Sequence, residues 1–315
     1  MTLKVPISVV IPTRNQGKVL NLCLSFLQKQ SVLPKEIIVV DNQSSDNTSK
    51  IIQSYIERIP IRYLKEKRIG PSFARNSGIA KAEGKIIALI DSDCLPDKNW
   101  LKNIWDFYQK HQDVILQGDW INKPIKKSLA SDLYLFSLEL HRNIIFSSND
   151  NIKRNSVSFF DTKNVAFPKT LVKKKGFLFD NCLPIYAEDV DFGIQAISGD
   201  TPIVFNKKLV VKHLFEISLS GFLRMNFKMG LARALLQKKW RFDDVNREKL
   251  GFWTKRIWNQ RRNRFIIDQE RKTLIGYLAS KNFGNKLVFR GLLVLKKLIQ
   301  FLGKSYGFLI RSSNN

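Results

Sequence analysis

The sequence predicts an α/β protein with a mostly parallel, Rossmann-like central sheet flanked by helices, followed by a basic helical region. Short apolar runs alternate with segments of helical periodicity, which is typical of βαβ units. The run Ile86–Ile90 has the composition of a strand that is buried on both faces. Charge is unevenly distributed: residues 1–211 carry 30 basic and 21 acidic side chains, whereas residues 212–315 carry 23 basic and 6 acidic ones.

The first third of the chain predicts alternating strands and helices. We expect strands at Ile7–Ile11, Glu36–Val40, Ile61–Leu64 and Ile86–Ile90, and helices at Asn15–Lys29, from about residue 48 to Glu57, at Gly70–Ala82 and at Trp100–Lys110. Pro12 is expected to end the first strand because proline has no amide hydrogen for a sheet. Right-handed crossovers then make neighbouring strands parallel.

Beyond Val114 the pattern changes to shorter strands and loops. We expect helices at Ser128–Phe146 and 186–197, and strands at Phe159–Asp161, Asn164–Phe167 and Ile203–Val211, the last ending near His213. Acidic residues open the helix at 186–197, where the helix dipole favours negative charge.

Two carboxylates follow the buried strand at Ile86–Ile90. Ligands of open α/β sheets bind beyond the carboxyl ends of the strands, which is where Asp91 and Asp93 are expected. Carboxylate oxygens suit Mg²⁺ or Mn²⁺. Taken alone, such a pair is also compatible with a turn or a helix cap.

The composition excludes a disordered chain and indicates an anionic partner. Hydrophobic residues make up 44% of the sequence, and the net charge is +26. A membrane surface, nucleic acid or a phosphorylated substrate would match this charge. Cys23, Cys94 and Cys182 form no C-x-x-C pair, so we expect a reducing cytosol rather than a zinc site or a disulfide framework. No signal peptide is expected, because the chain enters a strand almost at once.

Five segments, in this order and at this spacing, resemble the family 2 glycosyltransferases, which are inverting enzymes with the GT-A fold. They are Ser8–Asn15, Ile37–Thr48, Gly70–Gly78, Asp91–Asp93 and Glu188–Asp191. The resemblance covers residues 5 to about 230. It implies transfer of a sugar from a nucleotide-diphosphate sugar to a hydroxyl of a glycan or lipid-linked acceptor, in cell-surface polysaccharide synthesis, with Mg²⁺ or Mn²⁺.

The resemblance also implies contacts with the nucleotide. Pro12, Thr13 and Arg14, at the end of the first strand, would contact the nucleotide. Asp41 would accept a hydrogen bond from the edge of the base. Its alternative role is to cap the turn that follows.

A second group of residues matches the diphosphate and metal positions of the family. Arg75 and Asn76 would lie near the diphosphate, where a guanidinium suits phosphate oxygens; a surface ion pair is the alternative for Arg75. Asp93, and less directly Asp91, would bind the metal that bridges the two phosphates. Asp91 would then also lie beside the donor. His213 would approach the metal or the diphosphate, or be merely structural.

Asp189 matches the catalytic base of the family. A carboxylate there would take the proton of the attacking hydroxyl, with Glu188 and Asp191 as neighbouring alternatives and helix capping as a non-catalytic role for all three. The segment Lys163–Lys169 resembles the acceptor side, but Pro168 and Lys169 replace the usual basic pair, which leaves Lys169 in doubt as a substrate contact. Trp120 would face the sugar or belong to the core.

We expect a catalytic domain at residues 1–230, with a nucleotide-sugar half at about 1–112 and an acceptor half at about 113–230, and a membrane-associating region at 231–315. Leu287–Ile310 predicts an amphipathic helix on which basic residues recur every seven positions, namely Arg290, Lys297, Lys304 and Arg311. Its charge-free runs are too short for a membrane span.

This helix suits an anionic membrane surface, at the cytoplasmic, inner face of the cell membrane. The alternative is a helix packed on the catalytic domain with a solvated basic edge. Basic and aromatic residues also alternate at 238–272, a pattern that fits nucleic acid, but we favour the membrane and expect no nucleic acid.

Two other functions are weaker. A nucleotidyltransferase would need a glycine-rich, lysine-bearing loop after the first strand, and Gln16–Lys18 is a poor version of it. A non-catalytic, basic nucleic-acid-binding protein on a degenerate transferase fold would have no need of acids at 41, 91, 93 and 189.

Overall fold

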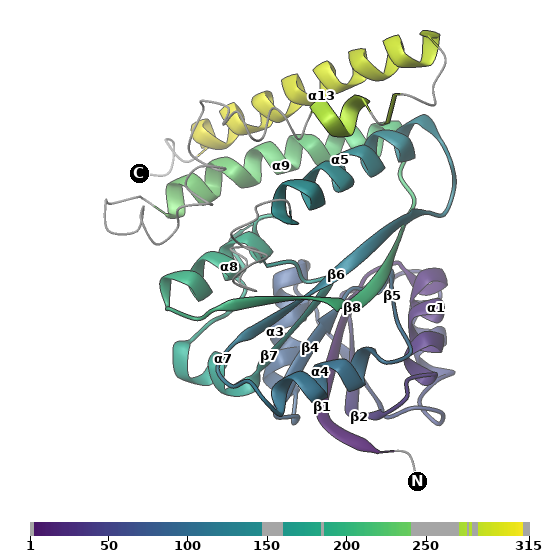
Figure 1. Cartoon of the computed structure of the whole chain (residues 1–315), viewed down its shortest axis with the longest axis vertical. Coiled ribbons are helices and arrows are strands. Elements are labelled where there is room, and N and C mark those ends of the chain that lie inside the picture. The colour runs from purple at the N-terminus through teal and green to yellow at the C-terminus, as the bar shows by residue number, and fades with distance from the viewer. Residues whose placement is uncertain are drawn as a thin grey trace. The chain divides into compact units, whose positions relative to one another are not determined.

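The computed structural model describes residues 3–146, 160–183, 186–240, 271–275, 277–278 and 283–310. Phe159 and most of the basic, aromatic segment 238–272 lie outside these residues. The chain forms two compact units. The first comprises Met1–Ile121, Asn155–Asn181 and Glu188–Leu214, and the second comprises Asn122–Arg154, Cys182–Ala187 and Phe215–Asn315 (Figure 1).

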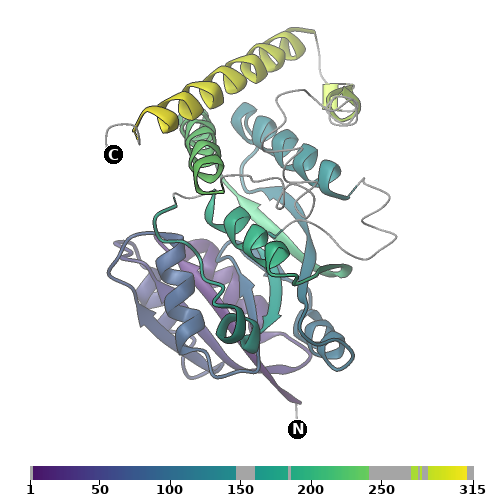
Figure 2. The ribbon, with the colours of Figure 1, turned by 90° about the vertical axis from the view of Figure 1, so that its left-hand side faces the viewer.

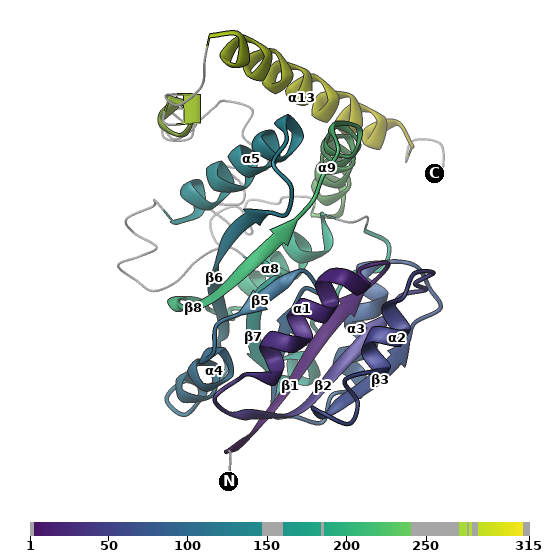
Figure 3. The same cartoon turned by 90° about the vertical axis from the view of Figure 1, so that its right-hand side faces the viewer.

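Parallel strands form one half of the central sheet. Strand β1 (Lys4–Thr13) pairs in parallel with β2 (Leu33–Asp41) on one side and with β4 (Ile86–Ile90) on the other. Strand β2 also pairs in parallel with β3 (Ile61–Lys65), and Figure 3 shows β1, β2 and β3 side by side. The connecting helices are α1 (Gly17–Gln28), α2 (Thr48–Gln53) and α3 (Pro71–Lys81). Every residue of β4 is buried, as its apolar run predicts. The carboxyl ends of these strands therefore meet at one edge of the sheet.

Antiparallel pairing extends the sheet beyond β4. The full order is β3-β2-β1-β4-β7-β6-β8-β5, with β5 at Cys94–Pro96, β6 at Ile115–Pro124, β7 at Asn164–Pro168 and β8 at Ile203–Phe215. Strand β7 runs against β4 and places Asn164 opposite Ile90. The residues before β7 thus lie beside the residues after β4, and this register brings distant polar segments together.

The remaining helices of the first unit are α4 (Trp100–Tyr108), α7 (Lys169–Lys175) and α8 (Glu188–Ser198). Helix α8 is fixed by Phe192, whose ring stacks on Phe160 and Phe179 with centroids 4.6 and 4.7 Å away. At Gly193 a Cβ would lie 2.9 Å from the Cβ of Phe160, so only glycine permits this approach. The position of the first turn of α8 follows from this packing.

Several expected boundaries move. Strand β1 continues through Pro12 to Thr13, because the Thr13 carbonyl still accepts a hydrogen bond from Asn42. The segment before β7 is irregular at Phe160 and Asp161 rather than a strand. Strand β8 extends past Val211, because the short strand β5 pairs with it, so that His213 lies within the strand and opposite Cys94.

Among the described residues, the second unit contains helices α5 (Leu129–Phe146), α9 (Leu219–Lys239) and α13 (Phe283–Ile310), and shorter helical stretches at 271–275 and 277–278. Their apolar residues form one cluster around Leu133, Phe136, Phe222 and Phe289. Helix α13, yellow in Figure 2, packs across α9, green in that view. Within the described ranges, none of the helices has the length and apolar character that a membrane crossing requires.

Candidate active site

The first part of the site is the turn after β4, which carries Asp91 and Asp93. Their side chains are 26 and 23% exposed, and the Asp93 carbonyl accepts a hydrogen bond from Leu214 of β8. Burial, followed by the negative charge of Asp91, raises the pKa of Asp93 to about 7. The turn therefore holds two carboxylates that repel each other and would be stabilised by a cation.

His213 reaches the same turn from β8. Its Nε2 lies 3.8 Å from Oδ2 of Asp93, and its side chain is nearly buried. Burial and the positive charge of Lys163 lower the pKa of His213 to about 3, so the imidazole is neutral at pH 7. A neutral imidazole is the form that ligates metals.

Asp91, Asp93 and His213 fit Mg²⁺ or Mn²⁺ in the way that proteins usually bind these ions beside a diphosphate. Within the described ranges, no three His, Cys, Asp or Glu side chains are grouped so that they could hold a metal ion by themselves. Mg²⁺ is typically held by one or two carboxylates together with substrate phosphates and water. A partly exposed carboxylate pair with one neutral imidazole beside it matches that mode.

Arg75 of α3 joins the turn after β4 to the start of α8. Its Nη2 lies 3.1 Å from Asp91 Oδ1 and its Nη1 lies 2.9 Å from Glu188 Oε1. The guanidinium is only 7% exposed and stands 5.4 Å from the centroid of the Phe179 ring. A buried charge is tolerated only when it is paired, which this bridge achieves.

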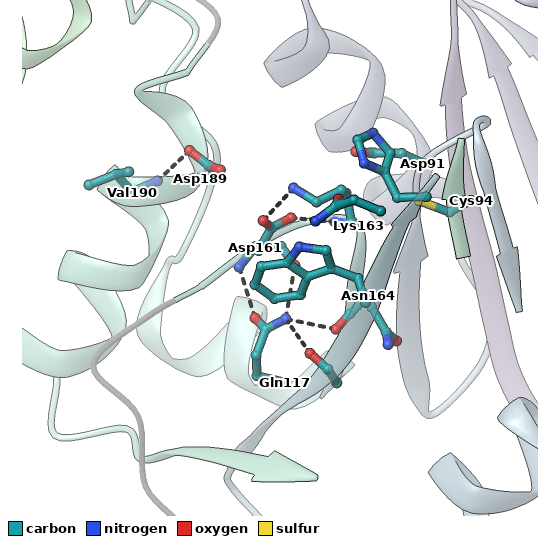
Figure 4. Close-up of polar contacts among 12 residues, drawn as sticks. Asp91, Cys94, Gln117, Asp161, Lys163, Asn164, Asp189 and Val190 are labelled. Carbon is teal, nitrogen blue, oxygen red and sulfur yellow. Dashed lines mark hydrogen bonds and ion pairs between the residues drawn. The ribbon is translucent and has the colours of Figure 1, made fainter. Parts of the chain in front are cut away.

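The three acids of α8 have different surroundings. Glu188 is committed to Arg75, and Asp191 is fully buried and accepts a hydrogen bond from Gln195 at 2.6 Å. Asp189 is half-buried and accepts a hydrogen bond only 2.7 Å long from the Val190 amide of its own turn (Figure 4). Burial, and then the charges of Glu188 and Asp161, raise the pKa of Asp189 to about 7. A carboxylate with this pKa suits proton transfer near neutral pH.

Asp161 and Lys163, just before β7, form a second ion pair in the site. The Lys163 ammonium is 2.5 Å from Asp161 Oδ2 and 5.2 Å from the centroid of the Trp120 ring. Gln117 of β6 holds the backbone of Asp161, with its Oε1 accepting from the Asp161 amide at 2.8 Å. In Figure 4, Lys163 lies between Asp91 on one side and Asp161 and Asp189 on the other.

Sequence reasoning missed the roles of Asp161 and Lys163. It assigned Lys163–Lys169 only to a general acceptor side, and it left Trp120 open between the sugar and the core. Trp120 is 1% exposed and is a core residue. Lys169, which was in doubt as a substrate contact, donates a hydrogen bond to the carbonyl of Ala82.

The residues expected at the nucleotide lie at the ends of β1 and β2. Thr13 pairs with Asp41 in the parallel register, Pro12 is half-buried and Arg14 is exposed. Thr13 Oγ1 is buried and has no hydrogen-bond partner among the described residues. Such an atom is available to a ligand that approaches this edge.

Asp41 also performs its alternative role of capping the turn. Oδ1 accepts from the Ser44 amide at 2.8 Å and Oδ2 accepts from the Tyr63 hydroxyl at 2.9 Å. Burial and Asp41 together raise the pKa of Tyr63 to about 12. A contact between Asp41 and a base stays a prediction.

Asn76 braces the chain before α8. Its Nδ2 donates to the carbonyl of Phe179 at 2.8 Å, and its Oδ1 accepts from the amide of the same residue at 3.1 Å. Phosphate contacts of Arg75 and Asn76 therefore stay predictions, because both side chains already hold protein groups.

In the loop before α1, the amides of Asn15 and Gly17 already donate to protein side chains. The Gly17 amide donates to Asp46 Oδ2 at 3.0 Å, and a Cβ at Gly17 would collide with the side chain of Asn47. This packing speaks against the nucleotidyltransferase alternative, which needs a phosphate-binding loop here.

Comparison with known proteins decides the family. The family model described as Glycosyl transferase family 2 matches residues 8–175, more than half of the chain. The chain belongs to this family. The match includes the turn after β4, Arg75 and the Asp161–Lys163 pair, and it ends before α8.

Curated relatives of this family 2 glycosyltransferase act in glycan synthesis. The chain is 27% identical over 262 residues to dolichyl N-acetyl-alpha-D-glucosaminyl phosphate 3-beta-D-2,3-diacetamido-2,3-dideoxy-beta-D-glucuronosyltransferase of Methanococcus voltae, a match that covers 78% of each chain. It is also 27% identical over 218 residues to chondroitin synthase of Pasteurella multocida, which covers 60% of this chain and 22% of that protein. The chain thus spans about a fifth of the chondroitin synthase.

Solved structures show the GT-A fold expected for this family 2 member. Mannosyltransferase PcManGT from Pyrobaculum calidifontis, in complex with GDP-Man and Mn²⁺, superposes with a TM-score of 0.62 at 14% identity and covers 98% of this chain and 90% of that chain. Residues 1–349 of Staphylococcus aureus TarS, in complex with UDP-GlcNAc, superpose with a TM-score of 0.53 at 17% identity and cover 99% and 92%. The expected GT-A fold class is confirmed, although the sheet is mixed rather than mostly parallel, because β5, β6, β7 and β8 pair in antiparallel fashion.

Proposed function

We propose that this family 2 glycosyltransferase moves a sugar, with inversion, from a nucleotide-diphosphate sugar to a hydroxyl of a glycan or lipid-linked acceptor. The observation that carries the proposal is the Asp91–Arg75–Glu188 bridge, with arms of 3.1 and 2.9 Å. It ties the carboxylate turn after β4 to the helix that bears Asp189. A donor site and a base held at a fixed separation are what an inverting transfer requires.

In the proposed mechanism Asp189 is the general base. As the acceptor oxygen attacks the anomeric carbon, its proton passes to the Asp189 carboxylate. The new carbon–oxygen bond forms on the face opposite the diphosphate, and the bond to the diphosphate oxygen breaks. The nucleoside diphosphate leaves with that electron pair, and the configuration of the sugar is inverted.

At the donor end, Asp93, Asp91 and His213 would hold Mg²⁺ or Mn²⁺. Such a cation neutralises the charge that develops on the departing diphosphate. Arg75 would keep Asp91 and Glu188 in place, and Asp191 is buried and accepts from Gln195, so that Asp189 is the α8 acid proposed for proton transfer. Support for the cation comes from the two repelling carboxylates of the turn and from Mn²⁺ in the PcManGT complex.

At the nucleotide end, Pro12, Thr13, Arg14 and Asp41 would contact the nucleoside of the donor, and Asn76 would lie near its diphosphate. The buried Thr13 hydroxyl supports this assignment, because it has no hydrogen-bond partner within the described ranges. GDP-Man and UDP-GlcNAc in the two neighbouring structures support a nucleotide-sugar donor.

We place the reaction in cell-surface polysaccharide synthesis, at the inner, cytoplasmic face of a membrane. Three relatives support a polysaccharide or a lipid-linked acceptor: chondroitin synthase, hyaluronan synthase and the Methanococcus voltae glucuronosyltransferase whose name gives dolichyl N-acetyl-alpha-D-glucosaminyl phosphate. Cys23 and Cys94 are buried thiols that take part in no disulfide, in keeping with a reducing compartment. Residues 1–230 would form the catalytic domain, and residues 231–315 the membrane-associating region.

A thermal-shift panel of nucleotide sugars, with and without Mn²⁺, tests the donor. The correct donor should raise the unfolding temperature, and only when Mn²⁺ is present to complete its site. The rise should be measurable, because a ligand at 100 times its dissociation constant stabilises the folded state by about 2.7 kcal/mol. Product anomers, followed by NMR, should show inversion. No response to any nucleotide sugar, together with salt-dependent retention of RNA, would instead favour the nucleic-acid-binding alternative.

A further inference from the structure

Helix α13 presents an apolar face to solvent, and its rotation about its own axis is fixed by its contact with α9. The two backbones touch at glycines: a Cβ at Gly230 would collide with the carbonyl of Gln300, and one at Gly303 with that of Phe227. Gln300 Nε2 also donates to Asn226 Oδ1 at 2.8 Å. This seam determines which residues of α13 face outward.

The outward face is made of large apolar side chains. They are between 50 and 68% exposed and recur at spacings of three, four and seven residues, so that they share one side of the helix: Leu287, Val294, Leu298, Phe301 and Leu302. A soluble surface rarely gathers such side chains contiguously without a partner.

Basic residues border this face. Arg290, Lys297 and Lys304 each lie three positions beyond Leu287, Val294 and Phe301, which places them in the adjacent row. Residues 287–309 contain no acidic residue, and neither does α9, which carries five basic ones: Arg224, Lys228, Arg233, Lys238 and Lys239. The helix pair is therefore cationic without internal compensation.

This combination selects an anionic lipid surface over a second copy of the chain. Two copies would bring together net charges of +26 each, and α13 offers no acid to pair with the basic row of a partner. A bilayer that contains anionic lipid supplies both phosphates for the basic row and acyl chains for the apolar one. A helix of 28 residues is about 42 Å long, enough to lie extended along such a surface.

We propose that α13 lies in the plane of an anionic membrane with Leu298, Phe301 and Leu302 inserted among the acyl chains. Arg290 and Lys297 then contact lipid phosphates at the edge of the inserted face. Sequence reasoning gave the leading role to the basic stripe; in the structure that stripe is the border of an apolar face. The inference concerns the second unit alone and holds whether or not Asp189 is the base.

The test uses the full chain and vesicles of phosphatidylcholine with and without phosphatidylglycerol. Leu298→Asn/Phe301→Asn should lower the membrane–water partition coefficient by about tenfold or more. Burial of each large apolar side chain raises that coefficient by a factor of about ten or more. The matched control, Leu22→Asn/Ile56→Asn, changes two apolar side chains of the first unit that are 40 and 44% exposed and should sediment like the parent. Arg290→Gln/Lys297→Gln should lose about fivefold per residue, on anionic vesicles only.

Insertion depth gives an independent measurement. A polarity-sensitive fluorophore on Phe301→Cys, in a Cys182→Ser background, should brighten on anionic vesicles and be quenched by lipids labelled in the acyl chain. Unchanged sedimentation of Leu298→Asn/Phe301→Asn, or a fluorophore that stays in water, overturns the proposal. A parent dimer that this double variant dissociates would instead make the face an interface between copies. Donor binding by calorimetry without vesicles reports on the transferase site separately.

Discussion

Removing the guanidinium of Arg75 is the most direct test of the bridge between the donor turn and α8. In Arg75→Met the side chain keeps its bulk against Phe179, but the carboxylates of Asp91 and Glu188 lose their common partner. Removing one partner of a buried ion pair typically costs about 3–5 kcal/mol. Glu188 is 6% exposed and bears most of this cost, whereas Asp91, at 26%, is partly hydrated, so we expect about 3 kcal/mol.

Urea unfolding followed by circular dichroism measures this loss. Lys102→Met is the control, because Lys102 pairs with Asp106 at the surface, where both side chains are about half exposed, and such pairs contribute about 1 kcal/mol at most. Adding Glu188→Met to Arg75→Met removes the stranded charge and should restore stability to within about 1 kcal/mol of the parent.

The same variants separate a brace from a phosphate ligand. Because the bridge positions the helix that carries Asp189, Arg75→Met should reduce turnover far more than donor affinity. Equal stability of Arg75→Met and the parent, or no recovery in the double variant, would refute the bridge as a structural element. A donor affinity that falls as steeply as turnover would instead indicate that Arg75 binds the diphosphate of the donor.

Three further perturbations address the metal, the base and its environment. Asp93→Asn should weaken Mn²⁺-dependent binding of a nucleoside diphosphate in calorimetry while circular dichroism stays unchanged; equal metal-dependent affinity would contradict the ligand role. Asp189→Asn should lower turnover by roughly 10²–10⁴-fold with an unchanged donor dissociation constant, and Asp191→Asn should be milder. Because the base must be ionised and its pKa is about 7, kcat/KM of the parent should rise tenfold per pH unit below 7 and level off above it. Lys163→Met removes a positive charge that lowers the pKa of Asp189 and should move this limb to higher pH by up to about one unit, whereas Lys169→Met should leave it in place.

The parallel half of the fold is predictable because its signals are local. Each strand is a short apolar run, each helix has its own periodicity, and the all-buried β4 follows directly from its five apolar residues. The antiparallel half depends on partners far along the chain. The three residues Cys94–Pro96 form a strand only because His213 and its neighbours pair with them. Their own sequence carries no pattern that predicts a strand.

The site residues also fall into those predicted by local motifs and those that depend on distant parts of the chain. Asp91, Asp93 and Asp189 were named from their motifs, and the structure places the first two on one turn and the third at the start of α8. The motifs did not identify the contacts that position these acids. Arg75 and Glu188 are 113 positions apart, and their pairing depends on how α3 and α8 pack. Lys163 was seen only as part of an acceptor-side segment, because its approach to the acids depends on the register of β7 with β4.

The charge balance of the site argues for a cation with the donor. The site residues include two cations, Arg75 and Lys163, and six carboxylates: Asp91, Asp93, Asp161, Glu188, Asp189 and Asp191. Burial first, and then the charges of neighbouring carboxylates, raise the pKa values of Asp93 and Asp189. A diphosphate carries further negative charge, so on electrostatic grounds these carboxylates would repel the donor alone. The +26 charge of the whole chain offers little relief, because exposed charges more than about 10 Å away are largely screened by salt. Donor binding by this site should therefore require a divalent cation between the carboxylates and the diphosphate.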